Sequence, residues 1–306
     1  MISVVIPLYN KEKQIAETLR SVLQQTFQDF EIVVVNDGST DGSVAVAESV
    51  QDKRIRIVHQ DNAGVSAARN RGIEVACYEF IAFLDADDRW KSDYLQTQVA
   101  LTQKYPECSV FACNYEFVHA DGSVHPTIIR KLPLESEDGI LSNYFEVASC
   151  SHPPICSISI MVRKAALESI GGFPVGITKG EDLLTWAKLA CKYQIAYCRS
   201  SFACYLLSSK HGLKSIPVNI PKGDAVGEEL RKLYKCFSAP YLKNYISRWY
   251  KIRANLYLRA GEDSYAIRNI CFSLRYNLFN WKIYVYALIL LVPSKYRNSI
   301  FKFFSR

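Results

Sequence analysis

The residues best suited to chemistry are three carboxylates in the stretch FLDADDRW, namely Asp85, Asp87 and Asp88. They directly follow an apolar run, residues 80–84, that reads as a buried strand. Like charges packed this closely repel one another. The stretch is therefore either an acidic turn exposed to water or a site that holds something positive between the carboxylates.

A second pair of acids, Glu181 and Asp182, opens the stretch GEDLLTWAKLACKY. Its apolar spacing predicts a helix over residues 180–193. Acids in a first turn are favourable near the positive end of the helix dipole, so the pair can simply stabilise the helix. A carboxylate within reach of a hydroxyl can also act as a general base. The residues alone leave both interpretations open.

The elements that would position these acids alternate between strand and helix. A short strand stopped by Pro7 is expected within residues 3–10, a second that runs into a Gly/Ser/Asp turn within residues 30–41, and others at residues 54–60 and 79–84. Helices are expected at residues 11–25, through Val46 and Val50, and at residues 65–77. In the first helix, Ile15, Leu19, Val22 and Leu23 share one face. Because the strands are apolar on both faces, they predict a parallel sheet covered by helices, an open α/β sandwich.

Polar residues follow each of these four strands. The clusters are Tyr9-Asn10, Asn36-Asp37-Gly38-Ser39, Asn62-Ala63-Gly64 and Asp85-Ala86-Asp87-Asp88. Ligands of such sheets bind at the carboxyl ends of the strands. Four polar loops on one rim indicate a binding site, which we expect to include Ser39, Asn62 and Gly64.

The chain changes character along its length. A hairpin is expected at Asp121-Gly122, and residues 155–173 read as a strand and a helix closed by Gly171-Gly172. Residues 210–306 hold 18 Lys and Arg against 5 Asp and Glu, whereas residues 1–209 hold 19 against 25. We predict a catalytic domain over residues 1–221, with a nucleotide-binding half at about 1–120 and an acceptor half at about 121–221. A basic, aromatic, helical extension follows at residues 222–306.

Cysteine usage and the opening segment bear on location. Ten cysteines occur without any C-x-x-C pair, so neither a zinc site nor a thioredoxin-like motif is indicated. The first residues lack the basic region of a signal peptide. Ten thiols without secretion favour a reducing cytoplasm.

Six motifs, in order and spacing, resemble the family-2 glycosyltransferases, inverting sugar transferases of the bacterial polysaccharide type. They are VVIPLYN, VNDGSTD, NAGVSAARNRG, FLDADD, GGF and GEDLLTW, and together they cover roughly residues 1–215. No single motif is diagnostic, but the ordered set is specific. The resemblance implies the GT-A fold, an open, mostly parallel sheet flanked by helices, here with a helical C-terminal extension. It also implies transfer from a nucleotide-diphosphate sugar, usually a UDP-sugar, to a saccharide hydroxyl.

The resemblance assigns donor-binding roles to five residues. Pro7, Tyr9 and Asn10 match the loop that lines the base pocket, and Asp37 matches the acid that accepts a hydrogen from the uracil imide. Arg69 matches a basic position beside the diphosphate, where a permanently charged planar fork suits phosphate. Tyr9 alone could also be a strand-end core aromatic, and Asp37 alone could cap a helix.

The resemblance also divides labour among the acids. Asp85 contacts the ribose side and Asp87 ligates Mn²⁺ or Mg²⁺, which neutralises the departing diphosphate. Asp88 either supports these contacts or faces the sugar. Asp182 is the base that deprotonates the acceptor hydroxyl, and Glu181 orients the acceptor or the loop.

Two further assignments and one departure concern the acceptor side. Trp186 either walls the acceptor site or packs in the core. By the resemblance, His211 falls where many family members carry a loop histidine near the diphosphate or metal; the alternative is a surface-loop histidine. The segment GGFPVGI has Pro174-Val175 where the family often has an acidic pair, which puts the acceptor-side loop in doubt.

The basic extension holds an uncharged apolar run at residues 283–292. A bilayer core needs about 20 residues, so the run is too short to span a membrane. Flanking cations and aromatic residues favour an anchor on the cytoplasmic membrane surface, where a lipid-linked saccharide acceptor would be presented. The alternative is a helical hairpin packed on the catalytic domain. No nucleic-acid-binding module is present in the sequence.

Three other classes of protein fit the sequence less well. A sugar-nucleotidyltransferase should carry a Gly-rich basic loop after the first strand, and a dinucleotide oxidoreductase should carry G-x-G-x-x-G there; PLYNKEKQ has neither. A sugar-nucleotide-binding protein without transferase activity should have lost Asp182 or the metal acids, and all of them are present.

Overall fold

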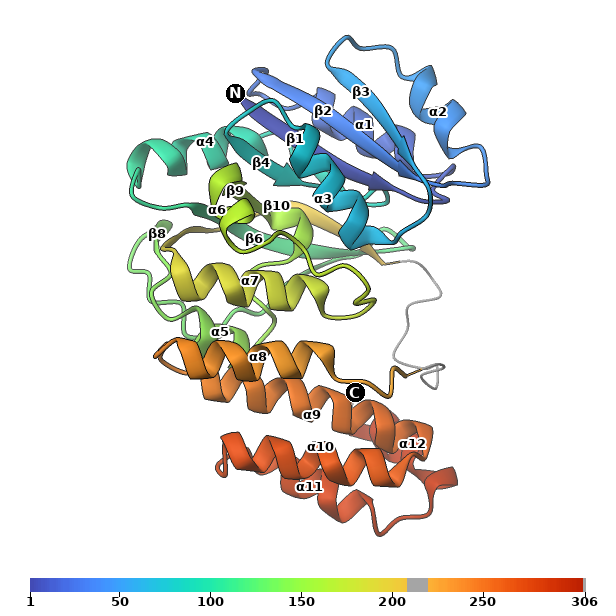
Figure 1. Ribbon diagram of the computed structural model, residues 1–306, viewed down its shortest axis with the longest axis vertical. Coiled ribbons are helices and arrows are strands. Elements are labelled where there is room, and N and C mark those ends of the chain that lie inside the picture. The colour runs from blue at the N-terminus through green and yellow to red at the C-terminus, as the bar shows by residue number, and fades with distance from the viewer. Residues whose placement is uncertain (208–219, 305–306) are drawn as a thin grey trace. The chain divides into compact units, whose positions relative to one another are not determined.

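The computed structural model describes residues 1–207 and 220–304 (Figure 1). The chain forms two compact units, Met1–Val147 with Ser151–Ser208, and Ala148–Cys150 with Ser209–Arg306. The boundary predicted from the sequence lies at residues 221–222. The units are described in turn.

The first unit is built on one sheet, to which ten strands contribute within the described residues, in the order β3-β2-β1-β4-β9-β6-β10-β5, with β7 beside β6 and β8 beside β10. The strands are β1 (Ile2–Leu8), β2 (Phe30–Asp37), β3 (Ile55–Gln60), β4 (Phe80–Phe83), β5 (Arg89–Trp90), β6 (Val110–His119), β7 (Val124–Pro126), β8 (Asp138–Ile140), β9 (Ile160–Arg163) and β10 (Ile195–Leu207). The long ladders are parallel and the short ones antiparallel. The predicted open α/β sheet of the GT-A type is confirmed.

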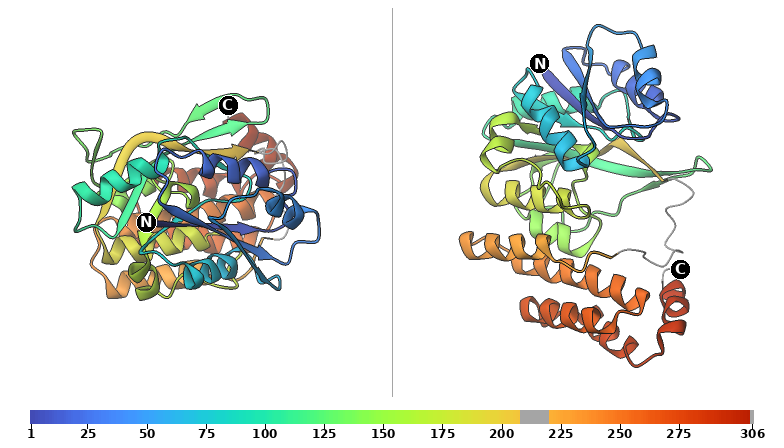
Figure 2. Two further views of the ribbon diagram at one scale, coloured as in Figure 1. Left: turned by 90° about the horizontal axis from the view of Figure 1, so that it is seen from above. Right: turned by 45° about the vertical axis from the view of Figure 1, so that its right-hand side comes forward.

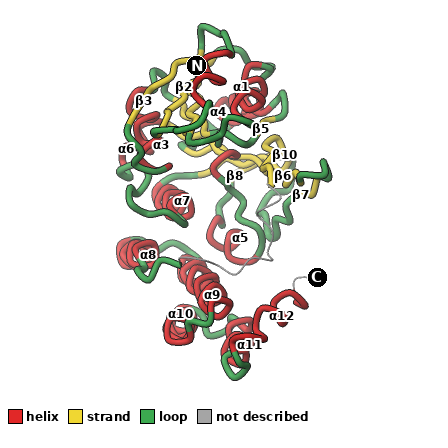
Figure 3. The backbone as a smooth tube through the Cα atoms, turned by 90° about the vertical axis from the view of Figure 1, so that its right-hand side faces the viewer, coloured by secondary structure: helices red, strands yellow, loops and turns green. Residues whose placement is uncertain are grey.

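Strands β1 to β4 run parallel to one another, so their carboxyl ends meet at one edge. The apolar residues of β1, β2 and β4 are buried because helices cover both faces of the sheet, whereas β3, at the end of the strand order, is only partly buried. These helices and turns are α1 (Ile15–Leu23), α2 (Ser43–Ser49), α3 (Val65–Val75), α4 (Tyr94–Lys104), α5 (Tyr144–Cys150), the 3₁₀ turn η1 (Ser157–Ser159), α6 (Lys164–Ser169) and α7 (Glu181–Lys192). Figure 3 shows α1 and α3 on opposite sides of the strands.

Helix α1 packs through the apolar face that was predicted for it. Ile15, Leu19 and Val22 of α1 are fully buried. Helix α3 approaches β1 so closely that a Cβ on Gly72 would lie 2.2 Å from Val5 Cγ1. Only glycine permits this approach, which places the residues of α3 directly over the sheet.

The hairpin predicted at Asp121-Gly122 joins β6 and β7, with Gly122 at φ 84°, and it projects from the first unit in Figure 2. Strand β10 was not predicted. Its ladder with β6 shifts register on either side of Ser201, so the alternation of side chains that marks a strand is broken in mid-sequence.

The second unit is helical, as predicted for the extension. Its helices are α8 (Ala225–Cys236), α9 (Leu242–Ala260), α10 (Asp263–Tyr276), α11 (Trp281–Ile289) and α12 (Ser294–Phe304). Helix α9 lies at its centre and contacts the other four. Over the described parts of the chain, no helix is both long enough and apolar enough to cross a membrane.

Candidate active site

The loops after β1 and β2 are joined by hydrogen bonds between backbone and side chain. Asn10 N donates to Ser39 Oγ (3.2 Å), and Thr40 N donates to Asn10 Oδ1 (2.8 Å). Asn10 adopts φ 51°, a left-handed conformation that asparagine tolerates better than most residues. Beside it, the Tyr9 side chain is exposed, whereas Pro7 is still part of β1. The structure thus leaves the Tyr9 ring free to meet a ligand.

Asp37, at the end of β2, organises the loop that leads into α3. Its Oδ1 accepts from Gln60 Nε2 (2.7 Å) and Ala63 N (2.9 Å), and its Oδ2 accepts from Gly64 N (2.9 Å). Asn62 Nδ2 donates to the Asp37 carbonyl oxygen (2.9 Å). Three predicted site residues, Asp37, Asn62 and Gly64, are therefore brought together. The carboxylate already accepts three hydrogen bonds, so any imide would share it with this loop.

Arg69 connects the two acid clusters that lie far apart in the sequence. Its Nη2 donates to Asp85 Oδ1 at 2.8 Å, and its Nη1 lies 3.5 Å from Glu181 Oε1. The side chain is only 3% exposed. Although burial opposes the charge, the carboxylates of Asp85, Asp182 and Glu181 outweigh it and raise the pKa of Arg69. Arg69 is therefore a buried cation held by acids.

Asn70 positions the segment that lies against Arg69. Its Nδ2 donates to Phe173 O, and Phe173 N donates to its Oδ1, both at 2.8 Å. The Arg69 guanidinium carbon then lies 5.1 Å from the centroid of the Phe173 ring, a cation–π contact. Phe173 was missed as a site residue, since only the fold shows that the GGF segment reaches α3.

The three adjacent aspartates have three different surroundings. Asp85 Oδ2 accepts from Ser157 Oγ (2.9 Å) in addition to its bond from Arg69. Asp87 is about one-third exposed and forms an ion pair with Lys11 Nζ at 2.5 Å. Asp88 is buried and its Oδ1 accepts from Leu206 N of β10 (2.7 Å).

The three aspartates therefore differ in burial and in their charged and hydrogen-bonded partners. Burial, and then the charge of Asp85, raise the pKa of Asp88 well above the usual range. Asp88 is enclosed and accepts a hydrogen bond from the β10 backbone, which holds its loop against that strand. Sequence reasoning missed Lys11 and Ser157. Lys11 directly follows the predicted rim residue Asn10, which is the signal that would have included it; no sequence signal marks Ser157.

Asp85 and Asp87 are the carboxylates that could serve a divalent ion. Across residues 1–207 and 220–304, no group of three or more His, Cys, Asp or Glu side chains gathers in a way that could hold a metal. The Asp87 carboxylate is paired with the Lys11 ammonium. One or two carboxylates suit an ion such as Mg²⁺, which keeps water and phosphate among its ligands. The donor set therefore fits the metal implied by the sequence.

The proposed base lies at the start of α7. Gly180 precedes the helix at φ 83°, and Asp182 Oδ1 accepts from Leu183 N at 2.7 Å. Burial raises the pKa of Asp182, with Arg69 opposing, and burial and the Asp182 charge raise the pKa of Glu181. A carboxylate whose pKa is raised is a stronger proton acceptor once it is ionised.

Of the two places predicted for Trp186, the wall of an acceptor site and the protein core, the structure shows the core. Its side chain is 1% exposed and packs against Phe83 and Phe173, with ring centroids 6.4 and 5.5 Å away. It supports Phe173, and thereby Arg69, from within the core. His211 lies outside the described residues.

Tyr205 of β10 is a further residue of this region. Burial, followed by the charges of Asp88, Asp85 and Asp87, raises its pKa to about 12. Its hydroxyl therefore stays protonated beside the acids and can donate a hydrogen bond. Sequence reasoning missed it because β10 was not predicted.

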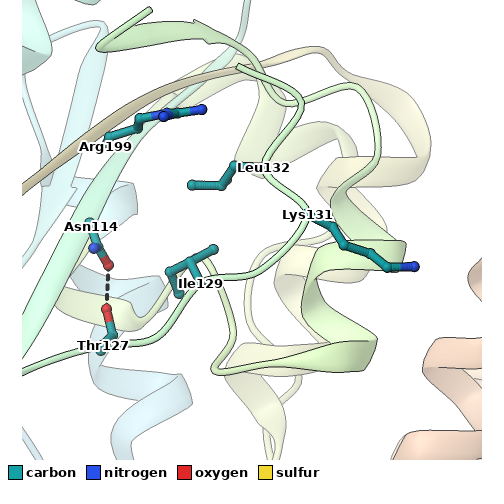
Figure 4. Close-up of a pocket in the computed structure, with 6 residues that line it drawn as sticks. All are labelled: Asn114, Thr127, Ile129, Lys131, Leu132 and Arg199. Atoms are coloured by element: carbon teal, nitrogen blue, oxygen red, sulfur yellow. Dashed lines mark hydrogen bonds between the residues drawn. The ribbon is translucent and has the colours of Figure 1, made fainter. Parts of the chain in front are cut away.

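A cavity of about 410 Å³ lies between β6, β10 and the loop after β7 (Figure 4). It is lined by Asn114, Thr127, Ile129, Lys131, Leu132 and Arg199. Thr127 Oγ1 donates to Asn114 Oδ1, and Lys131 points away to pair with Glu146. None of these residues was predicted as a site residue from the sequence.

Comparisons with known proteins agree with this architecture. A family model described as Glycosyl transferase family 2 matches residues 3–171. The chain is 30% identical over 201 residues to TuaG of Bacillus subtilis, named for teichuronic acid biosynthesis, covering 64% of this chain and 75% of TuaG. It is 38% identical over 128 residues to the glycosyltransferase GlyG of Streptococcus pneumoniae, covering 41% of this chain and 42% of GlyG.

Other relatives are longer than this chain. An uncharacterized glycosyltransferase of Rickettsia conorii is 36% identical over 199 residues, which are 63% of this chain but 31% of that protein. The chain thus spans about a third to two-fifths of the first curated relatives it matches. Among solved structures, S. aureus TarS in complex with UDP-GlcNAc superposes with a TM-score of 0.70 at 21% identity, covering 90% of this chain and 81% of that one.

Proposed function

Since the chain belongs to glycosyltransferase family 2, we propose that it moves a sugar from a UDP-sugar to a hydroxyl of a saccharide acceptor, inverting the anomeric centre. The observation that carries this proposal is Arg69, which joins Asp85 and the Glu181-Asp182 pair in one buried charge network. A site for the leaving group and a base are thereby held together by one residue.

In the proposed mechanism, Asp182 accepts the proton of the acceptor hydroxyl as the oxygen attacks the anomeric carbon. The bond from that carbon to the nucleoside diphosphate breaks on the opposite side, which inverts the centre. Arg69 keeps the Glu181-Asp182 pair in place and balances part of its charge. Tyr9 and Asp37 lie at the rim where the uracil would be bound.

We assign Asp87 as the protein ligand of Mn²⁺ or Mg²⁺, with Asp85 beside the ribose. A divalent ion there would neutralise charge on the departing diphosphate. Lys11 would have to release Asp87 when the ion binds.

Replacing Asp87 by Ala should weaken Mn²⁺ binding at least tenfold, because the carboxylate ligand is lost. Replacing Lys11 by Met should strengthen it severalfold, since a partly exposed ion pair contributes about 0.2–1 kcal/mol and would no longer compete. Free Mn²⁺ is counted by electron paramagnetic resonance without nucleotide. Unchanged Mn²⁺ affinity in Asp87→Ala would remove Asp87 from the metal site.

Donor identity is tested by calorimetry with UDP, CDP, GDP and a panel of UDP-sugars, with and without Mn²⁺. We expect UDP and one UDP-sugar to bind best, because TarS, which shares the fold, is known in complex with UDP-GlcNAc. Release of UDP with a suitable acceptor would separate a transferase from a protein that only binds sugar nucleotides. Tighter binding of CDP or GDP would contradict the role of Asp37.

We also propose that the acceptor is a lipid-linked saccharide and that the protein works peripherally on the cytoplasmic face of the membrane. Two observations support this: a relative is named for teichuronic acid biosynthesis, and the second unit is strongly basic. Anionic lipids attract such a surface.

A further inference from the structure

Helix α11 and the turn before it present apolar side chains that the second unit leaves uncovered. Phe279 is 94% exposed and Leu291, just beyond the helix, 82% exposed. Leu278, Trp281 and Leu288 are each about two-thirds exposed. We call these five residues the apolar tip. Side chains this large are seldom so exposed together unless they serve an interaction.

The spacing shows that the exposure belongs to one face. Trp281, Tyr284, Leu288 and Leu291 are three, four and three residues apart, which places them on one side of a helical path. On the other side, Ile283 and Ile289 are buried among residues of α9 and α10. A surface helix in water normally turns a polar face outward. Helix α11 is apolar on both faces, so its outer face lacks the polar side chains that a surface helix normally exposes to water.

The charged residues around the apolar tip are mostly basic. Asp263 lies close to it, but that carboxylate is paired with Arg297, whose guanidinium also donates to Leu290 O and Val292 O. No Asp or Glu follows Asp263 in the sequence. Lys282 and Lys295 are exposed near the apolar tip, and Arg275 lies in the last turn of α10, just before it. Burial, and then the charges of Arg248 and Lys282, lower the pKa of Lys251 to about 8.

We propose that the apolar tip inserts into the headgroup region of an anionic bilayer while Arg275, Lys282 and Lys295 contact the lipid phosphates. Exposed aromatic and aliphatic residues beside cations are the composition that binds at a membrane interface. A second copy of the chain fits less well, because pairing two such faces would bring like charges together. This inference rests on the proposed function for the need to reach a membrane, and it names the surface that does so.

The inference narrows the anchor predicted from the sequence. Within residues 283–292, Ile283 and Ile289 stabilise the second unit and are unavailable to lipid. Leu278 and Phe279, which precede that run, become part of the anchor instead. Deleting α11 would expose its partners on α9, so point substitutions at exposed positions are the better test.

The test compares the full chain with the triple variant Phe279→Ser, Trp281→Ser, Leu288→Ser in sedimentation with vesicles of phosphatidylcholine alone or with 30 mol% phosphatidylglycerol. We expect the full chain to bind the anionic vesicles preferentially and salt to weaken binding. The triple variant should partition at least tenfold less. The matched control is Ile128→Ser, Val175→Ser, which removes two exposed apolar side chains of the first unit and should bind like the full chain.

Equal sedimentation of the triple variant and the full chain would overturn the proposal, as would failure of the full chain to bind anionic vesicles. A dimer that the triple substitution dissociates, without vesicle binding, would show that a second copy covers the apolar tip instead. Circular dichroism should show unchanged helix content in the triple variant. UDP affinity, measured on the same samples, should be unchanged; a full chain that binds vesicles but no nucleotide would count against the proposed function and leave the surface assignment standing.

Discussion

Replacing Asp182 by Asn is expected to lower kcat by about 10²–10⁴-fold, the usual contribution of a general base, while UDP affinity stays unchanged. Asn keeps the shape of the side chain and can still accept from Leu183 N, but it cannot take a proton at neutral pH. Initial rates of UDP release and calorimetric titration of UDP, on the same samples, separate the two effects.

The pH dependence gives an independent check on this assignment. Asp182 must be ionised to act as a base, and burial raises its pKa. Activity should therefore fall with decreasing pH at values above those of an exposed aspartate, and the residual activity of Asp182→Asn should lack this limb. The matched control is Glu181→Gln, which should lose less activity because Glu181 is the neighbour and not the base. Full turnover by Asp182→Asn would place the base elsewhere.

Replacing Arg69 by Met should lower the free energy of unfolding by about 3–5 kcal/mol at neutral pH, because it leaves charges unpaired in the protein. Asp85 would lose its bond from Nη2, and the Glu181-Asp182 pair would lose its counter-charge. Urea denaturation followed by fluorescence measures the change. The matched control is Arg71→Met, two residues along α3, whose exposed pair with Glu74 should contribute less than about 1 kcal/mol.

The stability defect should depend on pH with a definite sign. Without Arg69, the pKa of each neighbouring carboxyl group rises in the folded state, so the folded protein binds more protons than the unfolded chain. Its stability then increases as pH falls through that range. The difference between Arg69→Met and the unsubstituted chain should thus be smaller at pH 5 than at pH 7.5. If Arg69→Met were as stable as Arg71→Met, the charge network would not be the framework of the site.

Local sequence patterns were sufficient for the elements that carry the rim. The apolar runs of β1, β2 and β4 and the apolar face of α1 are short-range signals, because strand and helix periods are set by residues a few positions apart. Polar residues directly after these strands then had to meet at one edge. The sequence therefore predicted that Asn10, Asp37 and Asp85 lie at the same edge of the sheet.

The same patterns did not identify β10 or the role of Trp186. A bulge at Ser201 interrupts the side-chain alternation of β10, so this strand was not predicted. Tyr205 and Leu206, whose backbone N–H donates to Asp88, lie on β10 and were missed with it. Trp186 lies on a helix beside the proposed base, and helical spacing alone does not tell a core face from a site wall. The packing of Trp186 against Phe83 and Phe173 shows that this residue lies on the core face of the helix. Such packing joins segments far apart in the sequence, and Phe83 is about 100 residues from Trp186.

The order of the motifs was enough to predict the family and the kind of site, since it specifies strands, turns and acids that occur together in one family. The surroundings of each acid became visible only in the folded chain. Asp85, Asp87 and Asp88 are near neighbours of the same chemical type, and they differ because Arg69 and Ser157, Lys11, and the β10 backbone reach them from separate parts of the chain. Charge and burial act through space, so residues adjacent in sequence acquire different protonation and different partners.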